Sequence, residues 1–351
     1  MKKLSFILPA FILFIIFQSS CSRPITGTNP VKESRFLMDT IVEITLYEPE
    51  KTSKLLLNEL FKEIKSYENK YSRHIPDSEI SRINQNPKKA VAVSEDTLKL
   101  VEESLYFSLI SDGLFDISIG PLTDLWDIKS AAPRVPTEAE IEKALGKVGY
   151  GSILTDETKN TVSVLQDGMS LDTGAIAKGF ITDKLVKYLE ERRIQSALIN
   201  LGGNLYLYGS KPNGSAWNIG IRDPYGLQGE YVATVEVSNM SVVTSGIYER
   251  FFEIDQKRYH HILNPKTGYP ENNNLASVSI LSPSSTLADG LSTTVFLLGL
   301  ENGTAFIDSM EEAEAIFLTK DRKIYFSSGI RKGKIPFHLT NKEFTIVTQT
   351  E

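Results

Sequence analysis

The chain has 351 residues, of which 41 % are hydrophobic and 23 % charged, and this length allows one large domain or two modest ones with a real core. Its formal net charge of -6 argues against nucleic-acid binding, because no basic stripe is available to neutralise phosphates. Four histidines and one cysteine leave no room for a zinc cluster or a disulfide framework.

The N-terminus, MKKLSFILPAFILFIIFQSSCSRP, has the features of an export signal. Lys2 and Lys3 form a positive start, and residues 4–17 form an apolar stretch too short for a comfortable membrane span. Small residues then lead into Cys21, as in a bacterial lipoprotein signal whose cysteine is acylated. Gln18 stands three positions earlier, where Leu is common, so an ordinary cleaved signal or an uncleaved anchor stays open.

These features predict three parts of the chain. Residues 1–20 are a lipoprotein signal peptide, residues 21–34 are a flexible polar tether, and residues 35–351 are one catalytic domain. The protein is then exported and lipid-anchored through Cys21 to a bacterial membrane, facing the periplasm or the cell exterior.

Hydrophobic periodicity predicts the first elements of the domain. Residues 41–47 alternate like a strand, and residues 52–70 and 96–112 carry apolar positions at helical spacing. The stretch GLFDISIGPLTDLW, residues 113–126, is strand-like up to Gly120.

From residue 150 onward strands dominate. A hairpin turns at Lys159 and Asn160, and a helix begins at about Gly174. The remaining predicted strands lie within residues 196–209, 217–224, 231–237, 240–246 and 276–283. A last helix starts near residue 286. The irregular alternation favours an α+β fold with a mixed, largely antiparallel sheet and flanking helices over a doubly wound sheet.

Two glycine-containing turns are candidate ligand sites. In LDTGAIAKGF, residues 171–180, Asp172 ends a predicted strand, and a helix follows whose first turn holds Lys178. Such a strand–turn–helix with glycines is a natural anion cradle. A lone Asp before a helix is also a common N-cap. In NLGGNL, residues 200–205, the paired glycines suit close approach to a ligand and a tight bend equally well.

Two later stretches carry polar side chains. VTSGIYERFF, residues 243–252, places a small polar turn beside a tyrosine and two charged residues. RYHHILNPKTGYP, residues 258–270, places His260 and His261 just before a loop with turn chemistry. Adjacent histidines on a strand are ordinarily one core and one surface residue, and a functional imidazole is the alternative.

Asp289 lies in TLADGLSTTVFLLG, residues 286–299, at the expected start of the last helix. As a cap it satisfies a helix N–H, at a cost of about 1 kcal/mol if lost. Asp289 and the hydroxyl of Thr293, four residues on, also form an all-oxygen pair of the type Mg²⁺ prefers, which would need a third oxygen from elsewhere. Spacing alone leaves both roles open.

Taken in order, these stretches resemble the ApbE family of FAD:protein FMN transferases. The resemblance covers nearly the whole chain after the tether. It is carried by MDT at 38–40, GLFDISIGPLTDLW, LDTGAIAKGF, NLGGNL, VTSGIYERFF, HHILNPKTG and ADGLSTTVFLLG. Each stretch is weak alone, and their shared order is specific.

The resemblance implies an activity. Family members split FAD at the pyrophosphate and transfer FMN to a threonine or serine hydroxyl of a partner protein, releasing AMP. The implied acceptors are subunits of membrane electron-transport systems, which leaves the acceptor of this chain unnamed. Mg²⁺ is implied at a backbone oxygen of Ala175 and the side chains of Asp289 and Thr293.

Further roles follow from the same resemblance. The positions implied to contact FAD or its flavin are Met38, Tyr71, Phe115, Asp116, Ile117, Asp172, Lys178, Gly246 and Ile262. Tyr71 is expected to stack on a ring system, and His261 to deprotonate the acceptor hydroxyl. Asp39 departs from the family pattern, in which glycine is usual at this position.

Two other functions compete with transfer. With water as nucleophile, the same site would make the chain an Mg²⁺-dependent FAD pyrophosphatase giving FMN and AMP. A non-catalytic FAD-binding lipoprotein is the alternative from another class, although storage needs neither a metal nor a base.

Overall fold

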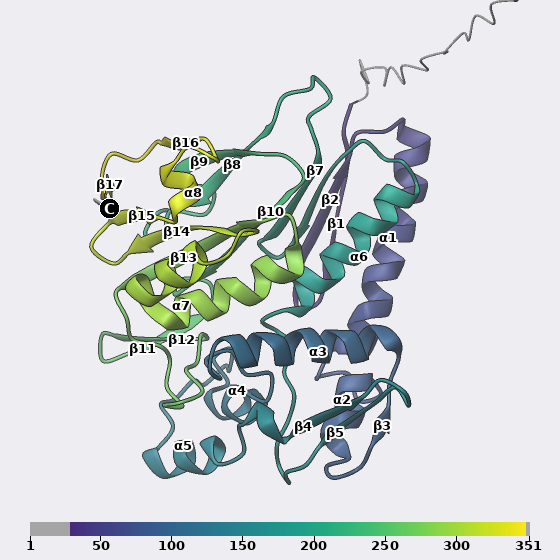
Figure 1. Cartoon of the computed structure of the whole chain (residues 1–351), viewed down its shortest axis with the longest axis vertical. Helices are drawn as coiled ribbons and strands as arrows, with labels where there is room; N and C mark the ends of the chain where they lie inside the picture. The colour runs from purple at the N-terminus through teal and green to yellow at the C-terminus, as the bar shows by residue number, and fades with distance from the viewer. Residues whose placement is uncertain (1–28, 349–351) are drawn as a thin grey trace, which may run out of the picture.

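A nine-stranded sheet runs through the part of the chain that the computed structural model describes, residues 29–348 (Figure 1). In sheet order its strands are β1 (Val31–Leu37), β2 (Thr40–Leu46), β6 (Ser196–Leu201), β7 (Asn204–Gly209), β10 (Met240–Gly246), β13 (Leu275–Ser282), β14 (Glu314–Thr319), β15 (Lys323–Phe326) and β17 (Thr345–Ile346). Neighbouring strands are antiparallel except β15 and β17. This confirms the predicted α+β class with a largely antiparallel sheet.

The first strand corrects the predicted start of the folded domain. Residues 31–34, assigned from the sequence to the tether, belong to β1 and pair with β2. The segment VKESRFL looks polar because β1 is an edge strand whose residues alternate between exposed and half-buried. The signal peptide, Cys21 and the rest of the predicted tether up to residue 28 lie outside the described residues.

Three long helices cover one face of the sheet. They are α1 (Glu50–Tyr71), α6 (Ala177–Glu191) and α7 (Ser285–Asp308). Helix α7 packs on β10 and β13, and α6 packs on α7 and β7 (Figure 1). Their apolar faces form the largest core with β2, β6 and β13.

The other face of the sheet is covered by a smaller sheet and a short helix. Its strands are β8 (Trp217–Arg222), β9 (Tyr231–Val237) and β16 (Phe337–Leu339), with α8 (Ser328–Arg331) nearby. A second apolar core lies between the two sheets.

The segment between α1 and α6 forms a separate layer against the end of the helices, drawn in blue and teal in Figure 1. Its elements are α2 (Glu79–Gln85), β3 (Val91–Ala92), α3 (Glu95–Ile110), α4 (Gly120–Trp126), α5 (Glu138–Leu145), the 3₁₀ turn η1 (Tyr150–Ser152), β4 (Ile153–Asp156) and β5 (Thr161–Val164). The hairpin of β11 (Phe251–Ile254) and β12 (Lys257–His260) packs on α4 and α5.

The strand predicted over residues 113–119 is wrong. Asp112 and Gly113 have positive φ values of 51° and 73°, and the chain continues in turns until α4 begins at Gly120. Asp116 stabilises a turn because its carboxylate accepts hydrogen bonds from the N–H and hydroxyl of Ser118. The strand expected before Asp172 is likewise reduced to one bridge between Ile119 and Ser170.

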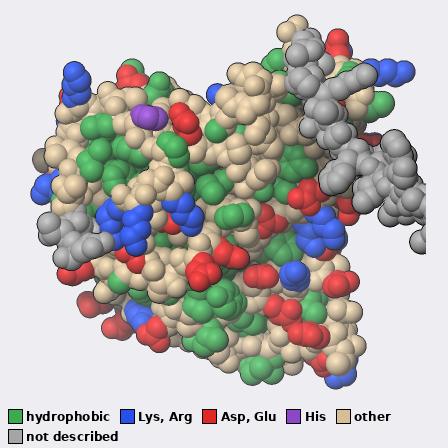
Figure 2. All heavy atoms as spheres, turned by 45° about the horizontal axis from the view of Figure 1, so that its top comes forward, with side chains coloured by type: hydrophobic (Ala, Val, Ile, Leu, Met, Phe, Trp, Pro, Cys, Tyr) green, Lys and Arg blue, Asp and Glu red, His purple; other side chains and the backbone are tan. Residues whose placement is uncertain are grey.

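Among residues 29–348, none of the helices combines the length and the apolar character needed to cross a bilayer. The face drawn in Figure 2 intersperses acidic, basic and hydrophobic side chains.

Candidate active site

Asp289 does not cap its own helix. Helix α7 begins at Ser285, and the preceding Ser284 is its N-cap, accepting a hydrogen bond from the N–H of Leu287 at 3.2 Å. Asp289 lies in the second turn, is 3 % exposed, and accepts a hydrogen bond from the N–H of Gly179 at 2.8 Å. Gly179 is in the first turn of α6, so Asp289 caps the neighbouring helix.

Asp183 of α6 in turn caps the start of α7, and no sequence pattern marked it as a cap. Its carboxylate accepts hydrogen bonds from the N–H groups of Ser285 and Thr286 at 2.7 and 2.9 Å. It also accepts from the hydroxyl of Thr286 at 2.6 Å. Each helix therefore supplies the acid that satisfies the free N–H groups of the other.

Gly179 allows α6 and α7 to come this close. A Cβ at this position would lie 2.2 Å from the carbonyl oxygen of Ser285 and 2.7 Å from Cβ of Asp289. The second glycine of LDTGAIAKGF, Gly179, is therefore required by the packing of α6 against α7.

A cation already lies beside the Asp289 carboxylate. Nζ of Lys178 is 3.3 Å from Oδ1 of Asp289 and 3.4 Å from the carbonyl oxygen of Gly174. The Lys178 side chain is 26 % exposed and that of Asp289 only 4 %. We call this place, where Asp289 of α7 meets Lys178 and Gly179 of α6, the α6–α7 junction. It holds a positive charge next to a carboxylate and a backbone oxygen.

The three predicted metal ligands lie around this junction. Thr293 follows Asp289 by one helical turn and is half-buried. Ala175 is half-buried in the turn between Gly174 and the start of α6. No three His, Cys, Asp or Glu side chains converge on one point anywhere in residues 29–348. A metal ion at this place would have to rely on a single carboxylate together with hydroxyl and carbonyl oxygens.

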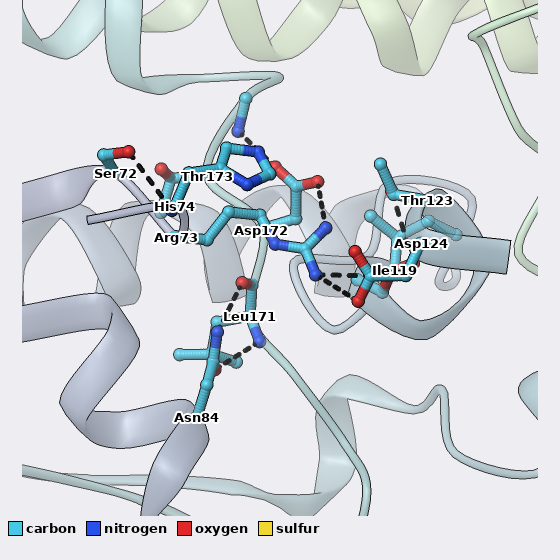
Figure 3. A network of polar contacts seen from close by, with 12 residues as sticks. Ser72, Arg73, His74, Asn84, Ile119, Thr123, Asp124, Leu171, Asp172 and Thr173 are labelled. Atoms are coloured by element: carbon cyan, nitrogen blue, oxygen red, sulfur yellow. Dashed lines mark hydrogen bonds and ion pairs between the residues drawn. The ribbon is translucent and has the colours of Figure 1, made fainter. Parts of the chain in front are cut away.

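Asp172 is held by the half-buried Arg73 (Figure 3). Nη1 of Arg73, just after α1, donates to Oδ2 of Asp172 at 3.1 Å, and Nη2 donates to Asp124 of α4 at 2.7 Å. The Arg73 side chain is 9 % exposed and that of Asp172 16 %. The other Asp172 oxygen accepts the N–H of Gly174 at 2.9 Å, which closes the turn that leads into α6.

His74 was not predicted and belongs to this region. Its imidazole lies beside Asp172 and Thr173 in Figure 3, and the residue is exposed. No sequence pattern marked it, because a lone histidine between Arg73 and a proline-containing turn has no distinctive spacing.

The stacking role predicted for Tyr71 is not supported. Its side chain is 1 % exposed and packs between the ring of Tyr67, 5.7 Å away, and that of Phe180, 6.0 Å away. Tyr71 is a core residue, and its backbone oxygen accepts the hydroxyl of Thr173 at 3.1 Å. Its helical spacing in α1 is the reason that it faces inward.

The side chains of Phe115, Asp116 and Ile117 are also buried rather than open to a ligand. Burial raises the pKa of Asp116, while hydrogen bonds from Ser118 and from the N–H of Tyr150 oppose that rise. Contact with a flavin through these three residues would therefore use their backbone.

Met38 lies at the turn between β1 and β2, with its N–H donating to Glu68 of α1 at 2.7 Å. Met38 and Asp39 have φ values of 54° and 58°, the conformation of a two-residue hairpin turn that favours glycine at its second position. Asp39 forms an ion pair with Lys129. That ammonium is the main cause of the lowered pKa of Asp39.

The two adjacent histidines occupy different environments. His260 is 4 % exposed, hydrogen-bonds the carbonyl oxygen of Glu271 through Nε2 at 2.9 Å, and meets Phe296 edge-on. His261 is half-buried, with Nδ1 3.3 Å from the carbonyl oxygen of Arg250. Burial lowers the pKa of His260 to about 4.

His261 has the more strongly lowered pKa, about 3, through burial first and then the charges of Arg250 and His260. The Lys178 ammonium contributes as well, so His261 lies within electrostatic reach of the α6–α7 junction. Both imidazoles are neutral at pH 7, and His261 is the one of the pair with accessible surface.

Gly246 and Ile262 serve packing. A Cβ on Gly246, the last residue of β10, would lie 2.7 Å from the ring of Tyr248. Ile262 is 4 % exposed and belongs to the main core. Just before Gly246, the hydroxyl of Ser245 bonds that of Ser292 on α7 at 2.8 Å, which fixes this strand end against the junction.

The NLGGNL turn is a tight bend. Gly202 and Gly203 have φ values of 59° and 92° and connect β6 to β7. A Cβ on Gly202 would lie 2.3 Å from the hydroxyl of Thr40. A tight bend therefore explains both glycines without a ligand.

The sequence model of the ApbE family matches residues 38–317, a span that contains every predicted site residue. The chain belongs to the ApbE family. It is 38 % identical over 296 residues to the FAD:protein FMN transferase of Klebsiella pneumoniae, covering 84 % of this chain and 91 % of that one. It is 35 % identical over 313 residues to the enzyme of the same name from Treponema pallidum, covering 85 % and 86 %.

A solved structure agrees with these relatives. The flavin transferase ApbE from Vibrio cholerae superimposes with a TM-score of 0.78 at 30 % identity, covering 87 % of this chain and 99 % of that one. The ApbE fold therefore extends over most of the described chain.

Proposed function

We propose that this ApbE protein is an FAD:protein FMN transferase that moves FMN from FAD to a threonine or serine hydroxyl of an acceptor protein and releases AMP. The observation that supports the proposal is the α6–α7 junction, where the buried carboxylate of Asp289 meets the first turn of α6 and the Lys178 ammonium. Its relatives bear the same name, at up to 38 % identity over most of the chain.

The residues at the junction fit a magnesium ion. Asp289 is buried yet faces a positive charge, Nζ of Lys178, so the site is built to neutralise a carboxylate with a cation. Asp289, Thr293 and a backbone oxygen of Ala175 would hold the ion. When bound, Mg²⁺ would neutralise the diphosphate of FAD and stabilise the departing AMP.

The protein's own groups account for the rest of the transfer. The dipole of α6 places partial positive charge at the end of the helix that borders the junction, where an anionic diphosphate would bind. Neutral His261 accepts the proton of the acceptor hydroxyl, whose oxygen forms a bond to the phosphorus of FMN. The bond between that phosphorus and the bridging oxygen of AMP breaks, and AMP leaves with the electron pair. The low pKa of His261 keeps its imidazole neutral before transfer, and it also makes that imidazole a weaker base than a free histidine.

The proposal is tested by mixing the domain with FAD, Mg²⁺ and an acceptor domain from a flavin-carrying electron-transport protein. We expect the acceptor to gain one FMN by intact-mass spectrometry, with matching AMP by chromatography. Asp289→Ala and His261→Ala should each lower the rate by about 100-fold or more. Free FMN and AMP with an unmodified acceptor would instead identify a pyrophosphatase, and bound but uncleaved FAD a storage protein.

We also propose that the protein is exported and lipid-anchored through Cys21. The proposal rests on the signal-like sequence before that cysteine, which lies outside the described residues. Expression of the full chain and of Cys21→Ser, followed by membrane fractionation and mass analysis of the mature N-terminus, tests it. An unmodified, membrane-free wild-type protein would contradict it.

A further inference from the structure

The Lys178 side chain bridges the two elements that would hold a cation. Its Nζ lies 3.3 Å from Oδ1 of Asp289 on α7 and 3.4 Å from the carbonyl oxygen of Gly174, in the turn before α6. Two oxygens from different elements thus face one ammonium. Both oxygens border the position that the proposed function assigns to Mg²⁺.

We propose that the Lys178 ammonium occupies the cation position of this protein in the absence of metal, and that Mg²⁺ binding displaces it. The inference rests on the proposed metal site and adds a step to it, the exchange of one cation for another. The displaced ammonium moves toward solvent, where it is free to pair with an anionic phosphate.

Burial explains why an internal cation is needed. The Asp289 side chain is 4 % exposed, and its other oxygen accepts the N–H of Gly179 at 2.8 Å. An ionised carboxylate buried to this depth without a counter-charge lowers the stability of the fold. Here the unpaired charge would lie within the close contact between α6 and α7. Lys178 can supply the charge reversibly, because its flexible stem comes from the first turn of α6 and a quarter of the side chain reaches solvent.

Lys184 is a matched reference on the same helix. Its Nζ pairs with Asp96 at 2.5 Å, and its side chain is 30 % exposed, close to the 26 % of Lys178. Asp96 lies at the start of α3 and has no part in the proposed cation position. Any general effect of Mg²⁺ on lysine reactivity will therefore appear at Lys184 too.

The experiment labels surface amines of the FAD-free protein with an acetylating reagent, with EDTA or with rising Mg²⁺, and follows each lysine by peptide mass spectrometry. We expect Mg²⁺ to raise the labelling rate of Lys178 several-fold and to leave that of Lys184 unchanged. In Asp289→Asn, Lys178 should label rapidly with or without Mg²⁺. In Lys178→Met, Mg²⁺ should raise the melting temperature at a concentration several-fold lower than in the wild type.

The outcomes separate this inference from the proposed metal site. Thermal stabilisation by Mg²⁺ that needs Asp289, with unchanged or slower labelling of Lys178, would overturn the displacement and leave the metal site standing. No Asp289-dependent stabilisation by Mg²⁺ in any variant would overturn both.

Discussion

Asp39 shows how a single residue can meet a backbone requirement that usually selects glycine. It holds a φ of 58° at the second position of the β1–β2 turn, where most side chains are strained and Asp or Asn is tolerated. Its ion pair with Lys129 is solvent-exposed and contributes little to stability. The conformation, rather than the charge, is what the position demands.

Replacing Asp39 separates these two effects. Asp39→Gly should be at least as stable as the wild type, because glycine adopts this φ freely. Asp39→Ala should lose about 1 kcal/mol of unfolding free energy, since it loses the pair and keeps the strain. Urea denaturation at pH 7 measures both, and an alanine variant as stable as the glycine variant would contradict the argument.

The paired histidines predict a pH dependence of stability. Burial lowers the folded-state pKa of His260 to about 4, against about 6.5 in an unfolded chain, so the unfolded state binds more protons between these values. His260 therefore leaves stability intact above about pH 6.5 and reduces it progressively as the pH falls toward 4.

His260→Gln removes this titration and keeps a side chain able to hydrogen-bond. Its unfolding free energy should fall less steeply between pH 7 and 5 than that of the wild type, by denaturant titration at several pH values. Parallel curves for the two proteins would show that His260 titrates normally.

At the scale of elements, the contact between α6 and α7 governs the site. Gly179→Ala places a methyl group 2.2 Å from a backbone oxygen of α7, so the helices must separate. We expect a loss of about 2 kcal/mol or more and a strong loss of FMN transfer. Gly151→Ala is the control, because a Cβ there meets nothing within 4 Å, and it should change stability by under about 0.5 kcal/mol.

Sequence patterns recovered the elements better than the contacts between them. The long helices and the hairpin of β4 and β5 followed from apolar periodicity and turn residues, which are local properties. Residues 113–119 were mistaken for a strand because apolar and polar residues alternate along them. In the structure, hydrogen bonds to the Asp116 carboxylate fold this segment into a turn instead. The reciprocal caps of Asp183 and Asp289 join residues about 100 positions apart, which no local spacing reveals.

Among the predicted site residues, too, sequence order was informative and the direction in which a side chain faces was not. Asp289, Asp172 and His261 were predicted because family resemblance preserves their order, and their functional roles stay predictions. The structure places Asp289 at the α6–α7 junction and Asp172 in the turn that leads into α6. Tyr71 was misjudged because an aromatic at helical spacing faces a core as readily as a ligand.

At the scale of the molecule, Arg73 joins the layer of α2–α5 to the turn that leads into α6. It pairs with Asp172 and Asp124 from a side chain that is 9 % exposed. Arg73→Met leaves Asp172 without its counter-charge and should cost about 3 kcal/mol of unfolding free energy and weaken FAD binding. Arg258→Met, which breaks an exposed pair with Glu253, should cost under about 1 kcal/mol. Equal losses in the two variants would show that the Arg73 network does not join the layers.

The crossed caps of α6 and α7 have a consequence for rate. Because Asp289 is fixed by the helix it caps, its carboxylate keeps one orientation before any substrate arrives. A preorganised charge of this kind does not have to reorient while the phosphoryl group moves, and that saving is a major source of catalytic power. The same hydrogen bonds that complete the fold therefore set the electrostatic field in which the reaction would take place.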